Sequence, residues 1–267
     1  MFIPFGFVNT QAGGGGDADA NTYIAAVQAG GGTLSGAEET AIQTFYTDLK
    51  AEGLYTQIDE MWMFLGGTAT SNAVGGKAVS NLSFQGTWSH SISGSYTDQD
   101  LANYADTGYN TSTDPSSGDA SSDFHFSAMA LGSVNTGYMG NGDINGTNFC
   151  LLGISGGSGE QFMGGGRSSL GIGFTGAGGW MMANRTSSAN FKTQRVYTGT
   201  LLSNTVTTTY TPYNGNLWFM GRNGSVNSVT SGRMLFGSVG TGMTDGDAQT
   251  FADKIIALQT AFSRNIW

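Results

Sequence analysis

The stretch from 178 to 240 constrains the fold of this chain more than any other. It contains five short runs rich in Thr, β-branched and aromatic residues, each bounded by Asn, Ser or Gly. Runs of this composition are typical of strands, and the residues between them are typical of turns. They cover residues 180–183, 191–197, 201–208, 217–220 and 233–239. Because no helical period separates them, the stretch predicts an antiparallel meander inside a β-sandwich or barrel.

The two-residue period extends over the wider range 66–243. Further candidate strands are 77–84, 87–92, 103–109, 124–131, 137–139, 148–154 and 169–174. Roughly a dozen strands fit two packed antiparallel sheets, each with a buried face. Glycine accounts for 44 of the 267 residues without a collagen-type triplet, so we assign the glycines to turns and close strand contacts. Residues 66–243 are therefore predicted to form a β-sandwich domain.

Helical periodicity is confined to the two ends of the chain. Residues 17–65 form the predicted N-terminal helical segment, with helices at 17–29 and 35–53 and a further turn or two over 54–65. Ser35 and Glu38 fit a capping box. Residues 244–267 form a predicted amphipathic helix that packs on the domain, with Arg264 placed to favour the helix dipole. The apolar stripe of that helix is Phe251, Ile255, Leu258 and Phe262.

Residues 1–16 read as an apolar arm followed by a glycine-rich joint. Four consecutive glycines at 13–16 give a flexible connection. The arm is too short to form a core, so we expect it either to anchor the protein to a neighbouring subunit or another protein, or to fold back on its own domain. The candidate anchoring residues are Phe2, Ile3, Phe5, Phe7 and Val8.

Charge and hydropathy exclude several classes of protein. The net charge is -9 with only ten Lys and Arg residues, so no basic stripe is present to neutralise nucleic-acid phosphates. No apolar run approaches the length of a transmembrane helix. Cys150 is the single cysteine, so no intrachain disulfide can form. Charged residues make up only 11%, which predicts a Ser, Thr, Asn and Gly surface of the kind found on proteins that assemble or bind outside cells.

Several segments together resemble a known family. They are DADANTYIAAV, DLKAEGLYTQIDEMW, GGTATSN, SFQGTWSHS, NYADTGYN, ANRTSSANF, FMGRNGSVN and SVGTGMTDGDAQTFADKI, spanning 17–255. Their order resembles the concanavalin A-like lectin and glucanase superfamily, especially its laminin-G-like relatives. More closely, it is similar to a family of bacteriophage and prophage virion-associated proteins. The resemblance implies a mainly β fold, an antiparallel jelly-roll sandwich with N-terminal helices and a C-terminal amphipathic helix. It implies no catalytic residues.

An enzymatic site is not expected. Laminarinase-type members of the superfamily use an ExDxxE strand, and this motif is absent. Retaining hydrolysis needs two carboxyls about 5 Å apart. Of the five Glu residues, only Glu160 falls in the predicted sandwich, on a glycine-rich loop, and Asp98 and Asp100 read as an exposed turn. His90 and His125 lie in strand-like runs, where a histidine is more often structural than catalytic.

Two kinds of binding site are possible. Exposed aromatic rings can stack on sugars, although tryptophans of a sandwich also serve as core residues. The candidates are Trp88, Trp180 and Trp218. Asn141, Asp143 and Asn145 have residue types that suit calcium but supply a single carboxylate, and the same NGDING run is a good hairpin turn. We therefore expect no cofactor, with calcium as the alternative.

The resemblance and the arm together favour one function over its alternatives. We expect a non-enzymatic structural protein located on the phage particle surface, a tail- or fibre-type adhesin with a lectin-like fold, anchored by its N-terminal arm. Its expected partners are other virion proteins, further copies of itself in a homo-oligomer and a cell-surface glycan. The alternatives are a head-decoration protein on the capsid, a free carbohydrate-binding module and, last, a glycan hydrolase.

Overall fold

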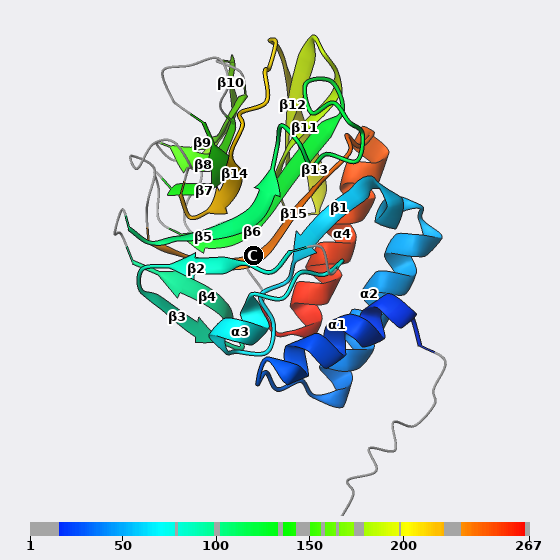
Figure 1. Cartoon of the computed structure of the whole chain (residues 1–267). Helices are drawn as coiled ribbons and strands as arrows, with labels where there is room; N and C mark the ends of the chain where they lie inside the picture. The colour runs from blue at the N-terminus through cyan, green and yellow to red at the C-terminus, as the bar shows by residue number, and fades with distance from the viewer. Residues whose placement is uncertain are drawn as a thin grey trace, which may run out of the picture.

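Two antiparallel β-sheets and a layer of helices make up the fold (Figure 1). It is a computed structural model that describes residues 16–77, 80–98, 102–132, 136–142, 150–155, 158–163, 166–173, 179–197, 199–221 and 231–264. The predicted fold class, a mainly β antiparallel sandwich with helices at both ends of the chain, is confirmed.

The first sheet contains eight strands within these residues. Its order is β13 (Thr200–Thr207), β12 (Asn190–Tyr197), β11 (Gly179–Ser187), β6 (Phe124–Gly132), β15 (Gly232–Gly240), β4 (Gly94–Thr97) and β3 (Trp88–Ser91). Strand β1 (Ile58–Trp62) also pairs with β15, beyond the shorter β4.

The second sheet contains seven strands among the residues described. Its order is β10 (Gly166–Gly173), β9 (Ser158–Met163), β8 (Cys150–Ser155), β7 (Thr136–Asn141), β14 (Asn216–Phe219), β5 (Tyr104–Asn110) and β2 (Ser83–Gln85). Within the described residues the two strand orders end in β3 and in β2, so each sheet ends in a strand of the 83–91 segment.

The three helices that the sequence predicts begin at their expected caps, Asp17, Ser35 and Thr244. The helical elements described are α1 (Ala18–Ala29), α2 (Gly36–Ala51), the 3-10 turn η1 (Leu54–Gln57), the short α3 (Ala69–Asn72) and α4 (Asp245–Ala261). The Ser35–Glu38 capping box is present at α2, and Thr244 with Asp247 forms another at α4. No described helix is long and apolar enough to cross a membrane.

The first sheet separates two apolar cores. One lies between this sheet and the helices, and the other lies between the two sheets. Successive residues of a strand point to opposite faces, so Trp180 and Met182 of β11 enter the helix-side core while Met181 and Ala183 enter the inter-sheet core. A strand covered on both faces has no polar side, which explains the unbroken apolar run in β11.

One close contact across the inter-sheet core requires glycine. A Cβ at Gly237 of β15 would lie 2.2 Å from the Phe219 ring of β14. The ring also meets Trp62 and Phe64 edge-on, at centroid distances of 5.4 and 5.5 Å. The bare backbone at 237 therefore lets one sheet receive an aromatic ring from the other.

The last helix is docked, as its stripe predicts. Phe251, Ile255 and Leu258 are buried in the helix-side core, and Lys254 forms an ion pair with Asp48 of α2 at 2.9 Å. Phe262 follows the end of α4 and is only partly buried. Figure 1 shows α4 lying beside α2 on the same side of the first sheet.

The prediction for Arg264 is wrong. The residue lies beyond α4, so it does not act on the last turn of the helix. Its buried guanidinium instead donates hydrogen bonds to the carbonyls of Ile92 at 2.8 Å and Phe64 at 2.8 Å. Burial lowers the pKa of Arg264 to about 10. Arg264 therefore ties the end of the chain to the β3–β4 turn and to the segment after β1.

The predicted helical turn over 54–65 is also wrong beyond η1. Gly53 ends α2 with φ at 73°, and after η1 the chain enters β1. Met61 and Met63 face the helix-side core, while Trp62 and Phe64 face the inter-sheet core. A short apolar run is compatible with a buried helix and with a buried strand. Here the run pairs with β15 and forms a strand. The sheets thus begin at Ile58, before the predicted boundary at residue 66.

The five-strand meander over 178–240 is correct only in its first three strands. β11, β12 and β13 are neighbours in the first sheet, but β14 joins the second sheet and β15 inserts between β6 and β4. Besides β1, two described strands were not predicted, β4 and β9. The backbone of Glu160 belongs to β9 rather than to a loop, paired with Gly153 and Ser169. Strand length is a local property, whereas strand order depends on long-range packing.

Candidate functional site

The three candidate tryptophans lie in three different environments. Trp180 is 0% exposed in the helix-side core, with its ring edge-on to Phe251 at 6.4 Å. It cannot reach a ligand on the surface, so its prediction as a sugar-binding residue is wrong. The reason is that Trp180 projects from β11 into the helix-side core, where it meets Phe251 of α4.

Trp88 lies in β3, the last strand in the order of the first sheet, next to Phe84 of β2, the last strand in the order of the second. Its half-buried ring packs on Phe84 at 5.0 Å, and its Nε1 donates to the Gln85 carbonyl at 2.9 Å. His90 joins this cluster, with its ring 4.6 Å from Phe84 and its Nδ1 2.9 Å from Ser95 Oγ. Partial burial lowers the pKa of His90. The rings of Phe84, Trp88 and His90 therefore pack mainly against one another.

Trp218 lies on the outer face of the second sheet. Its neighbours Leu217 and Phe219 are both buried in the inter-sheet core, so alternation along β14 turns Trp218 outward. The half-buried ring stacks on Tyr104 of β5, with centroids 3.6 Å apart and planes 13° apart. Its Nε1 makes no hydrogen bond among the described residues. Two partly exposed aromatic rings thus form one platform.

Polar groups flank this platform in register. Asp106 lies directly across from Trp218, and its Oδ1 accepts hydrogen bonds from Asn216 Nδ2 at 3.0 Å and from the Gly108 amide at 2.9 Å. On the other side of Trp218, Gly140 of β7 continues the same row. We call Tyr104, Asp106, Asn216 and Trp218 the platform site.

The platform site has the chemistry of a sugar-binding surface. Aromatic faces stack on the apolar faces of sugars, and carboxylate and amide groups fix the orientation of their hydroxyls. Sequence reasoning found Trp218 and both strands but missed Tyr104, Asp106 and Asn216. The alternation in YADTGYN and NLWF places each of them outward, but the pairing of β5 with β14 is not written in either run.

The calcium prediction does not fit Asn141. Its side chain is fully buried, and Nδ2 donates to Thr111 Oγ1 at 2.9 Å and to the Gly215 carbonyl at 3.0 Å. Its Oδ1 accepts from the Cys150 thiol at 3.0 Å. The amide is therefore used between strands and is not presented to a metal. Asp143 and Asn145 lie outside the described residues, as do the candidate anchoring residues Phe2, Ile3, Phe5, Phe7 and Val8.

His125 lies in the interior of the protein. It is 0% exposed, its Nδ1 donates to the Thr241 carbonyl at 2.6 Å, and Ser238 Oγ lies 3.2 Å from Nε2. Burial lowers its pKa to about 4, so the ring is neutral at pH 7. This geometry fits the structural reading of this histidine. Asp98 is exposed and accepts from Asn103 Nδ2 at 2.6 Å, while Asp100 lies outside the described residues.

Comparison with known proteins yields distant fold similarities alone. No protein-family model matches the chain, and no curated protein sequence does either. The botulinum neurotoxin serotype D binding domain is similar with a TM-score of 0.49 and 11% identity, over 73% of this chain and 52% of that one. A Trypanosoma rangeli sialidase is similar with a TM-score of 0.49 and 9% identity, over 82% and 39%. The chain thus spans about half or less of the length of these proteins. Identities and TM-scores this low say nothing about its function.

Proposed function

We propose that this protein is a non-enzymatic adhesin of a phage particle that binds a cell-surface glycan through the platform site. The carrying observation is the stacked pair of Tyr104 and Trp218 on the outer face of the second sheet, flanked by Asp106 and Asn216. The family resemblance of the segments over 17–255 supplies the phage context. Anchoring through the N-terminal arm and assembly into a homo-oligomer are part of the same proposal.

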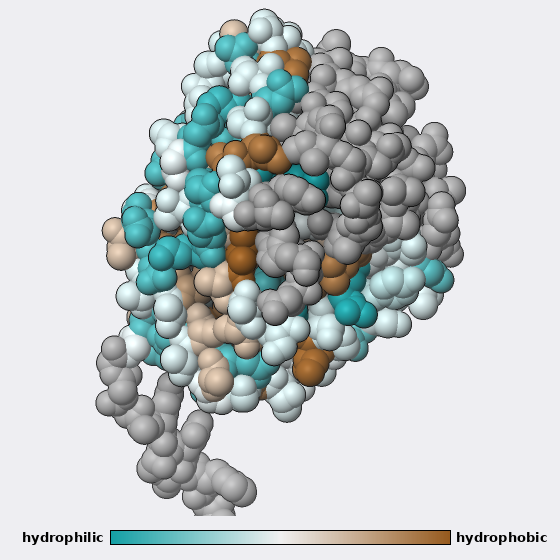
Figure 2. Space-filling model, turned by 180° about the vertical axis from the view of Figure 1, so that it is seen from behind, coloured by the Kyte–Doolittle hydropathy of each residue, from teal (hydrophilic) through white to brown (hydrophobic). Residues whose placement is uncertain are grey.

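The chemistry of the platform favours binding over hydrolysis. Among the outward-facing residues of β2, β5 and β14, Asp106 supplies the one carboxylate, and it is already bonded to Asn216 and to a backbone amide. Retaining and inverting glycosidases both need a pair of carboxyl groups. Few charged residues and a surface of Ser, Thr and Asn also suit recognition of neutral sugars. Figure 2, seen from behind, shows apolar side chains in separate small groups among hydrophilic ones.

A glycan array tests the proposal. The full chain should bind a subset of cell-surface glycans, and Trp218→Ala should weaken that binding about tenfold or more, as loss of a central aromatic contact does. Trp88→Ala is the matched control, because Trp88 is also half-buried but belongs to the edge cluster. Equal loss in both variants, with both still folded, would contradict the assignment to the platform site.

Two further measurements separate the alternatives. Immunogold labelling of intact particles should place the protein on the tail or fibres, whereas labelling over the capsid would favour a head-decoration protein. Incubation with the bound glycan should release no reducing ends. Release that disappears in Asp106→Asn would instead make the platform a hydrolase site.

A further inference from the structure

A groove of about 240 Å³ lies between α2 and α4. The side chains that line it are spaced i, i+3, i+4 and i+7 along each helix, so they form one face of each. They are Ala41, Thr44, Phe45 and Asp48 of α2, and Lys254, Ala257, Leu258 and Ala261 of α4. Phe45 and Leu258 are buried in the helix-side core, whereas Thr44, Ala257 and Ala261 are exposed and small. Small side chains at the rim thus leave an opening above two apolar core residues.

The charges of the groove are already paired. Asp48 and Lys254 line it and form an ion pair with each other at 2.9 Å. The hydroxyl of Thr44 donates to the Thr40 carbonyl at 3.0 Å, and the other lining side chains are apolar. A charged group placed here would lose its water without gaining a partner. The groove therefore suits an uncharged, apolar occupant.

The N-terminal arm has this chemistry. Residues 1–12 contain no charged side chain. Their large apolar side chains are Phe2, Ile3, Phe5, Phe7 and Val8. Pro4 and Gly6 disfavour a helix, and in an extended segment Ile3, Phe5 and Phe7 project to the same side. Such a segment presents one apolar edge to a groove.

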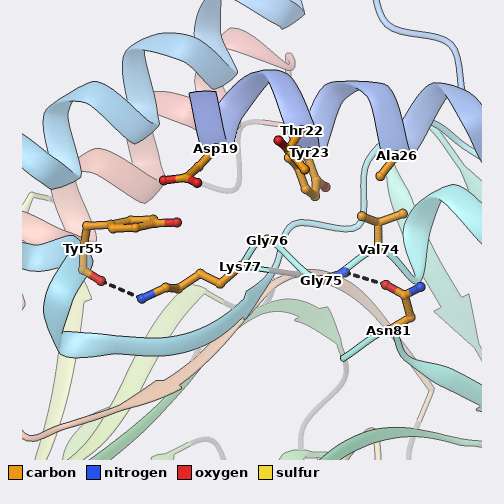
Figure 3. Close-up of a pocket in the computed structure, with 10 residues that line it drawn as sticks. All are labelled: Asp19, Thr22, Tyr23, Ala26, Tyr55, Val74, Gly75, Gly76, Lys77 and Asn81. Atoms are coloured by element: carbon orange, nitrogen blue, oxygen red, sulfur yellow. Dashed lines mark hydrogen bonds between the residues drawn. The ribbon is translucent and has the colours of Figure 1, made fainter. Parts of the chain in front are cut away.

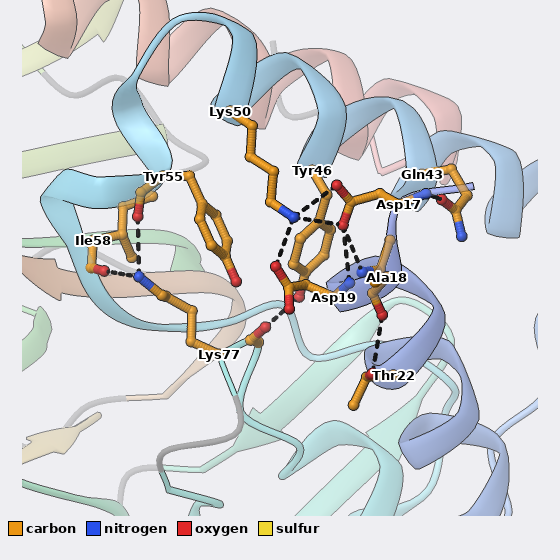
Figure 4. Close-up of polar contacts among 12 residues, drawn as sticks. Asp17, Ala18, Asp19, Thr22, Gln43, Tyr46, Lys50, Tyr55, Ile58 and Lys77 are labelled. Atoms are coloured by element: carbon orange, nitrogen blue, oxygen red, sulfur yellow. Dashed lines mark hydrogen bonds and ion pairs between the residues drawn. The ribbon is translucent and has the colours of Figure 1, made fainter. Parts of the chain in front are cut away.

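The described part of the chain begins beside α2, the helix that forms one wall of the groove. The Asp17 amide donates to Gln43 Oε1 at 2.7 Å, and Asp17 Oδ2 lies 2.7 Å from Lys50 Nζ (Figure 4). In the sequence, residues 1–15 precede this point, and an extended segment of that length spans up to about 50 Å. A helix with its side chains is only about 10–12 Å wide. The arm is therefore long enough to enter a groove on an adjacent molecule.

The arm begins on the side of α2 opposite to its own groove. Gln43 and Lys50 share the face of α2 that holds Asp17, whereas Ala41 and Asp48 share the face that lines the groove. Residues two positions apart on a helix are about 200° apart, so the two faces are nearly opposite. To enter its own groove the arm would have to pass around α2, and each joint residue fixed along that path would cost conformational entropy.

The other cavity on the helical side fits the arm less well. It has a similar volume of about 240 Å³ and lies between α1 and residues 74–77 (Figure 3). Asp19 and Lys77 line it, so an apolar segment placed there would cover a carboxylate and an ammonium and displace their water. The groove between α2 and α4 is the better match.

We propose that this groove binds the N-terminal arm of a second copy of the chain, with Ile3, Phe5 and Phe7 above Phe45 and Leu258. The inference rests on the proposed function, in which the arm assembles a homo-oligomer, and it names the surface that receives the arm. An arm of one copy in the groove of the next is a heterologous contact. Contacts of this kind generate a ring if the rotation closes and an open chain if it does not.

Sedimentation velocity of the full chain tests the groove. The parent should self-associate, and Ala257→Glu should weaken self-association about tenfold or more, because it places a carboxylate where the arm would lie. Ala25→Glu is the matched control, since Ala25 is also an exposed alanine within a helix but lines neither cavity. Both variants should keep the melting temperature of the parent, because both positions are exposed.

Mixing two defective variants tests whether the arm crosses between copies. The double variant Phe5→Asp, Phe7→Asp has an intact groove and a charged arm, whereas Ala257→Glu has an intact arm and a charged groove. Each alone should be monomeric at a concentration at which the parent assembles. An equimolar mixture should give a complex of one copy of each, because one intact arm then meets one intact groove.

The outcomes separate this inference from the proposed function. If the double variant assembles like the parent, the arm is not the anchor, which contradicts both. If only Ala257→Glu assembles like the parent, the arm remains the anchor and the groove is wrongly assigned. Two folded, monomeric variants that give no complex when mixed would overturn the exchange between copies and leave each arm on its own chain.

Discussion

Replacing Phe251 with alanine should lower the free energy of unfolding more than any other single alanine substitution in α4. Phe251 is 0% exposed, and its ring lies 6.0 Å from that of Phe236, 6.2 Å from His125 and 6.4 Å from Trp180. A large-to-small change at such a site removes about 3–5 kcal/mol from the free energy of unfolding. Three lost ring contacts place the expected value in the upper half of that range.

Phe262→Ala is the matched control for this experiment. It deletes the same side chain just beyond the same helix, where the ring is only partly buried and lies 5.4 Å from the Arg264 guanidinium carbon. The expected loss is about 1 kcal/mol, typical of a partly exposed site.

Urea unfolding followed by tryptophan fluorescence and by circular dichroism measures both losses. For a chain of this size each kcal/mol corresponds to about 2–4 °C in melting temperature, so Phe251→Ala should melt about 10 °C below the parent. If Phe251→Ala loses no more than Phe262→Ala, α4 is not docked on the first sheet and the helix-side core is wrongly assigned.

Three further predictions follow from buried or arm residues. Arg264→Ala should cost about 3–5 kcal/mol, since it leaves buried carbonyls unbonded, and Arg264→Lys should recover only part of it in the same unfolding assay. The pKa of His125 falls from 6.5 to about 4 on folding, so stability is complete above pH 6.5 and decreases by about 3 kcal/mol as the pH falls to 4. In a His90→Gln background, adding His125→Gln should make the loss of stability between pH 6.5 and 4 smaller. An unchanged pH dependence would refute the assignment of this loss to His125. Deleting residues 1–12 should leave the melting temperature nearly unchanged but abolish oligomers in light scattering, and normal assembly would show that the arm is not the anchor.

Local patterns in the sequence determined the elements of this protein. The capping box of Ser35 and Glu38, the apolar stripe of the last helix and most strands are where the residues predict them. These features depend on hydrogen bonds and side-chain spacing within a few residues, so they can be read without knowing the rest of the chain. Trp218 was also found this way, as an aromatic residue in a short strand.

The tertiary structure alone decided which elements meet. Alternation says that Trp180 and Trp218 each face one side of a strand, but only the positions of α4 and of β5 bury the first and leave the second beside Tyr104 and Asp106. The run after Gly53 forms a strand because it pairs with β15, and Tyr23 lines a cavity because residues 74–77 lie opposite α1. Strand order and inter-element contacts arise from packing between residues far apart in the chain, and no local pattern encodes them.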